Sequence, residues 1–298
     1  MRTRLVALSV VLLAGLFCAS NLLAQTAPQA GASNKPVPRA ANGKPDLAGL
    51  WRVNPLRSNI LQPPGANAAG GNAAGGGGLG GDPTGRDPYR VPAFGFLPVG
   101  TDGRPQEPPL QPWALEKYRA IRKGALTLVH RGPEEHDPAM RCIPEGFPRA
   151  YTYPDPFEIL HPLPDRIVMI FPTMNQARQI YTDGRKHTDV GPMFMGHAIG
   201  HWDGDNLVTD TIALKGDPLV WLDTHGTPHS DQLHVIERIK RPTYDTLEID
   251  FTFEDPGAFT RPWEGKKRFF LMPADWEQME YMVCDTPKAL GGDDQYSF

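Results

Sequence analysis

The sequence predicts a mainly β protein, in which an antiparallel meander closes into a barrel or packs as a β-sandwich. Short apolar segments of strand length follow one another from residue 157 onward, and tight turns such as Asp203-Gly204 separate them. Gly (31) and Pro (32) together make up about a fifth of the 298 residues. This content of helix breakers excludes a helical bundle or a coiled coil.

The strands are predicted from apolar runs and from alternation of polar with apolar residues. Between residues 246 and 253, Leu247, Ile249, Phe251 and Phe253 alternate with polar side chains, which is typical of a strand with one buried face. Residues 112–124 form the one convincing helix, which we expect to end at Gly124. The predicted strands are 46–53, 166–171, 176–181, 197–202, 205–212, 233–239, 246–253, 268–272 and 278–283.

Residues 1–24 have the pattern of a signal peptide. Arg2 and Arg4 precede an uncharged apolar run that is too short to span a bilayer comfortably, and cleavage is expected near Ala24. An N-terminal membrane anchor is the alternative. We therefore expect a periplasmic or secreted protein, with no membrane span in the mature chain.

The rest of the chain divides by composition. Residues 25–45 are predicted to be a flexible leader, and 46–110 to hold a first strand and Pro-rich loops. Within them, residues 65–81 (GANAAGGNAAGGGGLGG) are a predicted disordered insertion, because their side chains can bury too little surface to offset the ordering entropy. The main β domain is expected at 111–290, with a flexible tail at 291–298.

The net charge bears on the class of binding partner, and the cysteines bear on a disulfide. The formal net charge is −4, so nothing favours nucleic-acid binding, and a small molecule is the expected partner. Cys142 and Cys284 remain after signal cleavage, and in an oxidising compartment they are expected to form a disulfide. The alternative is a reactive thiol at Cys142, where Arg141 and Arg149 would favour the thiolate.

Several strings resemble a widespread group of exported bacterial proteins that are mostly labelled hypothetical. The strings are GKPDLAGLW (43–51), CIPEGFPR (142–149), RQIYTDGR (178–185), HWDGDNLVTDT (201–211), WLDTHGTPHSDQLHVIERIKR (221–241) and EDPGAFTRPW (254–263). This resemblance implies no biochemical function. Gly49-Leu50-Trp51 also resembles the Gly-X-Trp start of lipocalin-type barrels, so a lipocalin-like barrel with an internal ligand cavity is the preferred architecture.

One candidate site comes from the hairpin around Asp203-Gly204. If these two residues form the turn, Trp202 pairs with Asp205 and His197 lies directly opposite Asp210. An Asp–His pair is the arrangement of an oriented general base, and a structural ion pair is the alternative.

A second candidate site is the string HGTPHSDQLHVIER, which follows Asp223. Its histidines and carboxylates suit a metal site, acid–base chemistry or a structural role, and the sequence does not decide among them. On a strand, His234 and Glu237 would point to opposite faces. The candidate ligands of a divalent metal are His225, His229 and His234.

The sequence therefore predicts an enzyme that acts on a small, partly apolar molecule by acid–base chemistry, as a lyase, isomerase or hydrolase. A non-catalytic periplasmic binding protein is the alternative. The candidate catalytic residues are Asp210, Asp223, His229 and His234, and the candidate ligand-binding residues are His197, Trp202, Trp221 and Arg238.

Overall fold

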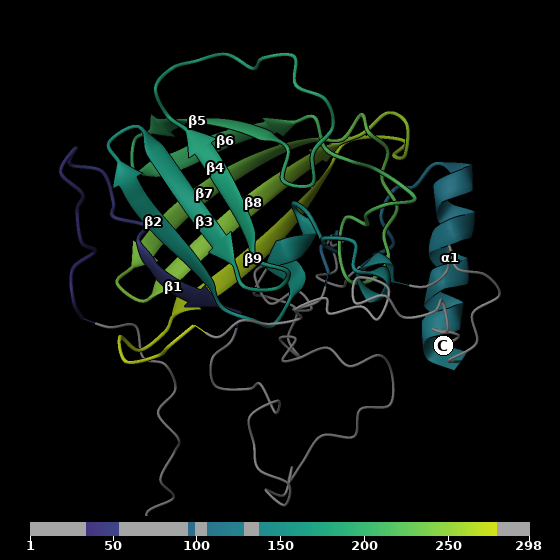
Figure 1. The fold of residues 1–298 in the computed structure, drawn as a ribbon, viewed down its shortest axis with the longest axis horizontal. Helices are drawn as coiled ribbons and strands as arrows, with labels where there is room; N and C mark the ends of the chain where they lie inside the picture. The colour runs from purple at the N-terminus through teal and green to yellow at the C-terminus, as the bar shows by residue number, and fades with distance from the viewer. Residues whose placement is uncertain (1–33, 54–94, 99–105, 128–136, 279–298) are drawn as a thin grey trace, which may run out of the picture. The chain divides into compact units, whose positions relative to one another are not determined.

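The computed structural model describes residues 34–53, 95–98, 106–127 and 137–278. In these residues, nine strands pair in chain order and β9 pairs back with β1, which closes a barrel (Figure 1). The mainly β, lipocalin-like barrel is thus confirmed. The strands are β1 (Gly49–Arg52), β2 (Phe157–Leu163), β3 (Arg166–Phe171), β4 (Gln176–Tyr181), β5 (His197–Asp203), β6 (Asn206–Ile212), β7 (His234–Thr243), β8 (Thr246–Glu254) and β9 (Trp263–Leu271).

The described chain has one α-helix, α1 (Pro112–Thr127), and two short 3-10 helices, η3 (Pro138–Arg141) and η4 (Arg149–Thr152). The predicted helix at 112–124 is confirmed, although it continues past Gly124. None of the described helices is long and apolar enough to cross a membrane.

The meander is not antiparallel throughout, which corrects the prediction. β4 and β5 run parallel, with Ile180 opposite Ala198 and Tyr181 opposite Ile199. Parallel neighbours need a crossover connection, which residues 182–196 provide. The Asp183-Gly184 sequence therefore lies at the start of a long loop and does not close a hairpin.

The register of the β5–β6 hairpin also differs from the prediction. Asp203 pairs with Asn206, so Gly204 and Asp205 occupy the turn, and His197 lies opposite Ile212. The φ of Gly204 is +60°, which suits the first central position of a type II′ turn. The slip is two residues long, so the residues that were predicted to share a face still do so.

Alternate residues of each strand point into the barrel, and their side chains fill its middle. Arg178 of β4 and Glu237 of β7 form a buried ion pair there, and the ring of Tyr151 enters from η4. The Tyr151 ring lies 5.2 Å from Phe157 and 5.3 Å from Phe171. These residues occupy the place where the lipocalin-like architecture led us to expect a ligand cavity.

Loops gather at the end of the barrel where β6 and β8 finish and β7 and β9 begin, which we call the loop end. Figure 1 shows α1 beside this end. Gly146 in the CIPEGFPR string has a φ of +71°, and a Cβ there would lie 2.6 Å from the carbonyl oxygen of Phe194. Only glycine allows these two loops to approach so closely.

The opposite end of the barrel is held by residues 34–48. Arg39 donates to both carboxylate oxygens of Asp205, at 2.6 and 2.8 Å, and Lys44 donates to the carbonyl oxygen of Gly204.

Several predictions lie outside the described residues. They concern the signal peptide at 1–24, the insertion at 65–81, the segment 279–283 of the last predicted strand, the tail at 291–298, and Cys284. The pairing of Cys142 with Cys284 stays a prediction.

Candidate functional site

Four neighbouring strands present titratable side chains on the outer face of the barrel. They are His197 of β5, Asp210 of β6, His234 of β7 and Glu254, the last residue of β8. The ladder places Glu254 directly opposite His234, and it places Asp210 opposite Ile236, the next outward residue of β7. The loop of residues 182–196 adds His187 to this group.

These five side chains form one continuous series of hydrogen bonds. Asp210 Oδ1 lies 2.8 Å from His234 Nε2 and 3.1 Å from His187 Nε2. His187 Nδ1 is 2.8 Å from His197 Nδ1, and His234 Nδ1 is 3.1 Å from Glu254 Oε2. We call the series His197, His187, Asp210, His234 and Glu254 the histidine–carboxylate chain.

Two histidines of the histidine–carboxylate chain, His234 and His197, have pKa values that are shifted in opposite directions. The hydrogen bond with Asp210 raises the pKa of His234, and the same contact lowers the pKa of Asp210. Burial lowers the pKa of His197, and the nearby His187 and Arg185 lower it further. The surroundings of His234 therefore favour an imidazolium ion and those of His197 a neutral imidazole, which is how acid and base roles become separated.

The middle of the histidine–carboxylate chain is open to solvent. The exposed fraction of the side chain is 44% for Asp210, 29% for His234 and 19% for His187. At the other end His197 is almost buried, with the Tyr181 ring centroid 6.0 Å from its own. A small molecule can therefore reach Asp210 and His234 from outside the barrel.

The predicted direct pair of His197 and Asp210 is wrong, because the β5–β6 register differs. The two residues do share a face, and His187 joins them. Sequence reasoning missed His187, which lies in a loop without periodicity. It also missed Glu254, because a register shift between Lys240 and Thr243 changes which residue meets His234.

Asp223 lies at the loop end and holds backbone in place. Its Oδ2 accepts from the backbone N–H of Phe96 at 3.0 Å, and its Oδ1 accepts from those of His225 and Thr227. Asp223 is fully buried. These contacts show that Asp223 holds the loop backbone in position. Asp223 does not contact the histidine–carboxylate chain.

His229 is also part of the loop packing. Its side chain is fully buried, its Nδ1 meets the carbonyl oxygen of Ser230 at 2.9 Å, and burial lowers its pKa. The neighbouring Ser230 donates to Asp255 from both its N–H and its hydroxyl, each at 2.6 Å. These contacts favour a structural role over the predicted catalytic one.

The three candidate metal ligands do not assemble. His225 and His229 belong to the loop end, and His234 belongs to the histidine–carboxylate chain. Within residues 34–53, 95–98, 106–127 and 137–278, no group of three or more His, Cys, Asp or Glu side chains has an arrangement that could hold a metal ion.

The other predicted ligand-binding residues are spread over the fold. Trp202 is half-buried against the core, and Trp221 is buried with the Arg149 guanidinium 5.2 Å from its ring. Arg238 is exposed and donates to Asp203 Oδ2 at 2.9 Å. These three residues do not surround His197.

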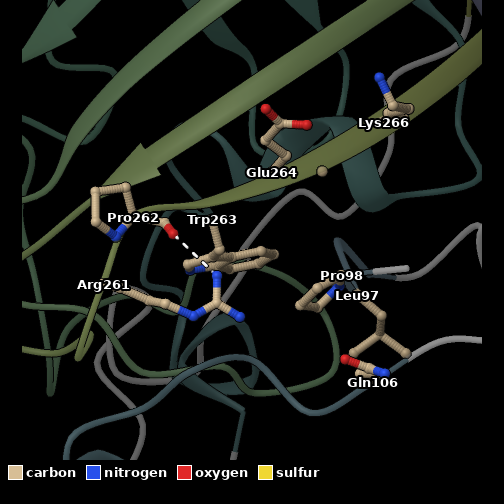
Figure 2. A pocket seen from close by; sticks show the side chains of 9 residues that line it. Leu97, Pro98, Gln106, Arg261, Pro262, Trp263, Glu264 and Lys266 are labelled. Atoms are coloured by element: carbon tan, nitrogen blue, oxygen red, sulfur yellow. Dashed lines mark hydrogen bonds between the residues drawn. The ribbon is translucent and has the colours of Figure 1, made fainter. Parts of the chain in front are cut away.

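A cavity of about 340 Å³ lies at the start of β9 (Figure 2). It combines the indole of Trp263 and apolar side chains with charged ones, and Figure 2 shows Arg261 beside Trp263. None of the residues predicted for the site takes part. The cavity is lined by Leu97, Pro98, Gln106, Arg261, Pro262, Trp263, Glu264, Gly265 and Lys266.

Comparisons of the chain with protein-family models, with curated proteins and with solved structures found no match.

Proposed function

We propose that this chain is an exported enzyme that moves protons on a small, partly apolar molecule at the histidine–carboxylate chain. One observation carries the proposal: a single oxygen, Asp210 Oδ1, meets Nε2 of both His187 and His234. Each of these imidazoles contacts a further titratable side chain through Nδ1.

The surroundings of His234 and His197 suggest their roles. His234, held in its charged form by Asp210, is the general acid. His197, whose neutral form burial favours, is the base, and His187 links it to Asp210. Asp210 orients the imidazoles of His187 and His234. An isomerase or a lyase, which removes a proton at one atom and adds one elsewhere, would use both ends.

Replacing Asp210 by Asn tests the proposal. Turnover is measured with the mature protein on a panel of small hydroxyketones, lactones and esters. For any substrate that the wild type converts, Asp210→Asn should lower kcat by about 10²–10⁴-fold, because the acid and base lose their shared carboxylate. Wild-type turnover should also show a bell-shaped pH dependence.

Asp203→Asn is the matched control. Asp203 lies on the same outer face, and its exposed carboxylate pairs with Arg238. The variant should leave kcat unchanged. Unaltered turnover in a folded Asp210→Asn variant would reject the proposal.

A binding protein without chemistry is the second candidate, and the cavity beside Trp263 favours it. Its volume of about 340 Å³ is enough for a small ligand. This candidate predicts saturable quenching of tryptophan fluorescence by the ligand, with the same Kd in wild type and Asp210→Asn.

A further inference from the structure

The crossover loop of residues 182–196 is fixed to the barrel at both of its ends. The backbone N–H of Thr182 donates to the carbonyl oxygen of Asp165 at 2.8 Å. The N–H of Met193 donates to the carbonyl oxygen of Ala213, also at 2.8 Å. Between these two points the loop passes over the histidine–carboxylate chain, to which it contributes a side chain.

The middle of this loop, residues 186–192, is attached to the barrel through one side chain. We call this segment the lid. Among the described residues, both hydrogen bonds from the lid to the barrel come from the imidazole of His187, which meets His197 Nδ1 and Asp210 Oδ1. Most of the other lid residues are exposed to solvent. The attachment of the lid therefore depends on His187.

The contact between His187 and His197 admits at most one charged imidazole. Their Nδ1 atoms lie 2.8 Å apart, so one of these nitrogens must donate and the other must accept. An imidazolium ion carries hydrogen on both nitrogens and cannot accept. Two imidazolium ions would therefore set N–H against N–H and bring two positive charges together, so a second protonation breaks this contact.

Of the two partners, the strand residue is the fixed one. His197 lies in the β5–β6 ladder opposite Ile212, is almost buried, and stacks on the ring of Tyr181. His187 belongs to the loop and is free to turn away. Since Nδ1 and Nε2 are parts of one rigid ring, a rotation that takes His187 Nδ1 away from His197 also takes Nε2 away from Asp210. Loss of the first contact therefore removes both attachments of the lid.

The charges around the two imidazoles determine where this happens on the pH scale. Burial lowers the pKa of His197, and His187 and Arg185 lower it further, so the second charge is taken up below the ordinary histidine pKa of about 6.5. The hydrogen bond from His234 lowers the pKa of Asp210, so this carboxylate stays ionised at pH 4.5. The titratable groups near the pair are Tyr181 of β4, Asp210 of β6, His234 of β7, Glu254 of β8 and Arg185 of the loop.

We propose that His187 and His197 form a pH-sensitive latch. The latch holds the lid over Asp210 while at most one of the two imidazoles is charged, and it releases the lid when both are charged. The inference rests on the proposed function in one respect, since the site that the lid uncovers is the histidine–carboxylate chain. Its test uses no substrate, so failure of the proposed function and failure of the latch give different results.

NMR relaxation of the backbone ¹⁵N nuclei tests the latch in the mature wild-type protein between pH 7.5 and 4.5. The order parameters of the lid should fall from about 0.8 to below about 0.6 as the second imidazole takes up its proton. Those of residues 34–48, at the opposite end of the barrel, should stay constant. Titration of the imidazole signals in the same samples gives the charge of His187 and His197 at each pH.

Three variants separate the latch from a general loosening of the protein in acid. His197→Gln cannot become charged, so its lid should stay ordered at pH 4.5. His187→Ala lacks the latch, so its lid should be mobile at every pH. His201→Gln is the matched control, because His201 is an exposed histidine of the same strand, and its lid should behave like that of the wild type.

Two results would overturn the proposal. The first is a wild-type lid whose order parameters are the same at pH 7.5 and 4.5 although both imidazoles have become charged. The second is a lid that loosens in His197→Gln at the same pH as in the wild type, which would mean that the His187–His197 contact does not control it.

Discussion

At the scale of single residues, Asp210 shifts the pKa of His234 on the outer face of the barrel. Its carboxylate is the first cause of the raised pKa of His234, ahead of burial, which acts in the opposite direction. The hydrogen bond also stabilises the fold. Since the folded pKa of His234 exceeds the unfolded one, this contribution is complete below the unfolded pKa and is lost as pH rises through the folded pKa.

Asp210→Asn should therefore lower the pKa of His234, which NMR titration of the imidazole would show. The loss of unfolding free energy in this variant should be greatest near pH 5–6 and should shrink as pH rises through the folded pKa of His234. Asp203→Asn should leave the titration of His234 unchanged. An unshifted His234 in Asp210→Asn would contradict the assigned hydrogen bond.

At the scale of elements, an ion pair joins strands that are not neighbours in the sheet. Arg178 of β4 donates to both oxygens of Glu237 on β7, and both side chains are at most 1% exposed. Thr209, Thr211 and Tyr151 make further hydrogen bonds with the pair, while Arg178 Nε is buried without a partner. The pair thus connects opposite walls through the middle of the barrel.

Removing one partner of this pair should destabilise the barrel strongly. Arg178→Met leaves Glu237 as an uncompensated buried charge, and we expect a loss of about 3–5 kcal/mol in urea denaturation. The double variant Arg178→Met/Glu237→Leu should lose much less than the sum of the single losses.

The neighbouring exposed pair supplies the control for this cycle. Arg238→Met, which breaks the contact with Asp203, should cost less than about 1 kcal/mol. Additive losses in the Arg178 and Glu237 cycle would mean that the two side chains do not interact as the structure places them.

At the scale of the whole molecule, burial disfavours the charge of several ionisable groups at the loop end, among them Glu145 and Lys267. Glu145 accepts a hydrogen bond from Gln176, its Oε1 is buried without a partner, and its pKa rises to about 7. The pKa of Lys267 falls to about 7. Together, the two groups lower the free energy of unfolding most near pH 7.

The two shifts predict a minimum in their combined contribution to stability near pH 7. Between pH 4.5 and 7 the folded state keeps a proton on Glu145 that the unfolded state has lost, so stability falls as pH rises. Between pH 7 and 10.5 the unfolded state holds a proton on Lys267 that the folded state lacks, so stability rises.

Denaturant unfolding at pH 5, 7 and 9.5 checks this prediction. Glu145→Gln should flatten the acidic side of the profile, and Lys267→Met should flatten the alkaline side. Lys266→Met, on the outer face, should change neither. If both variants showed the same dependence of unfolding free energy on pH as the wild type, Glu145 and Lys267 would titrate normally and the prediction would be wrong.

The sequence alone determined most of the β architecture, because alternation is a local property of the chain. The pattern at residues 246–253 marks a strand with one buried face, and His234 and Glu237 indeed point to opposite sides of β7. The same alternation predicted that His197 and Asp210 share a face, but it took this face to be an apolar one, whereas in the structure it is the outer face of the barrel. Site residues on regular strands were therefore within reach of sequence reasoning.

The tertiary structure decided which side chains meet. His187 reaches Asp210 because a crossover loop, with no period of its own, folds over parallel strands. The pKa of Lys267 depends on Phe96 and Asp223, which are far from it in sequence. Pair contacts and desolvation arise from segments that only closure of the barrel brings together, so the local pattern fixes the face of a residue but not its partner.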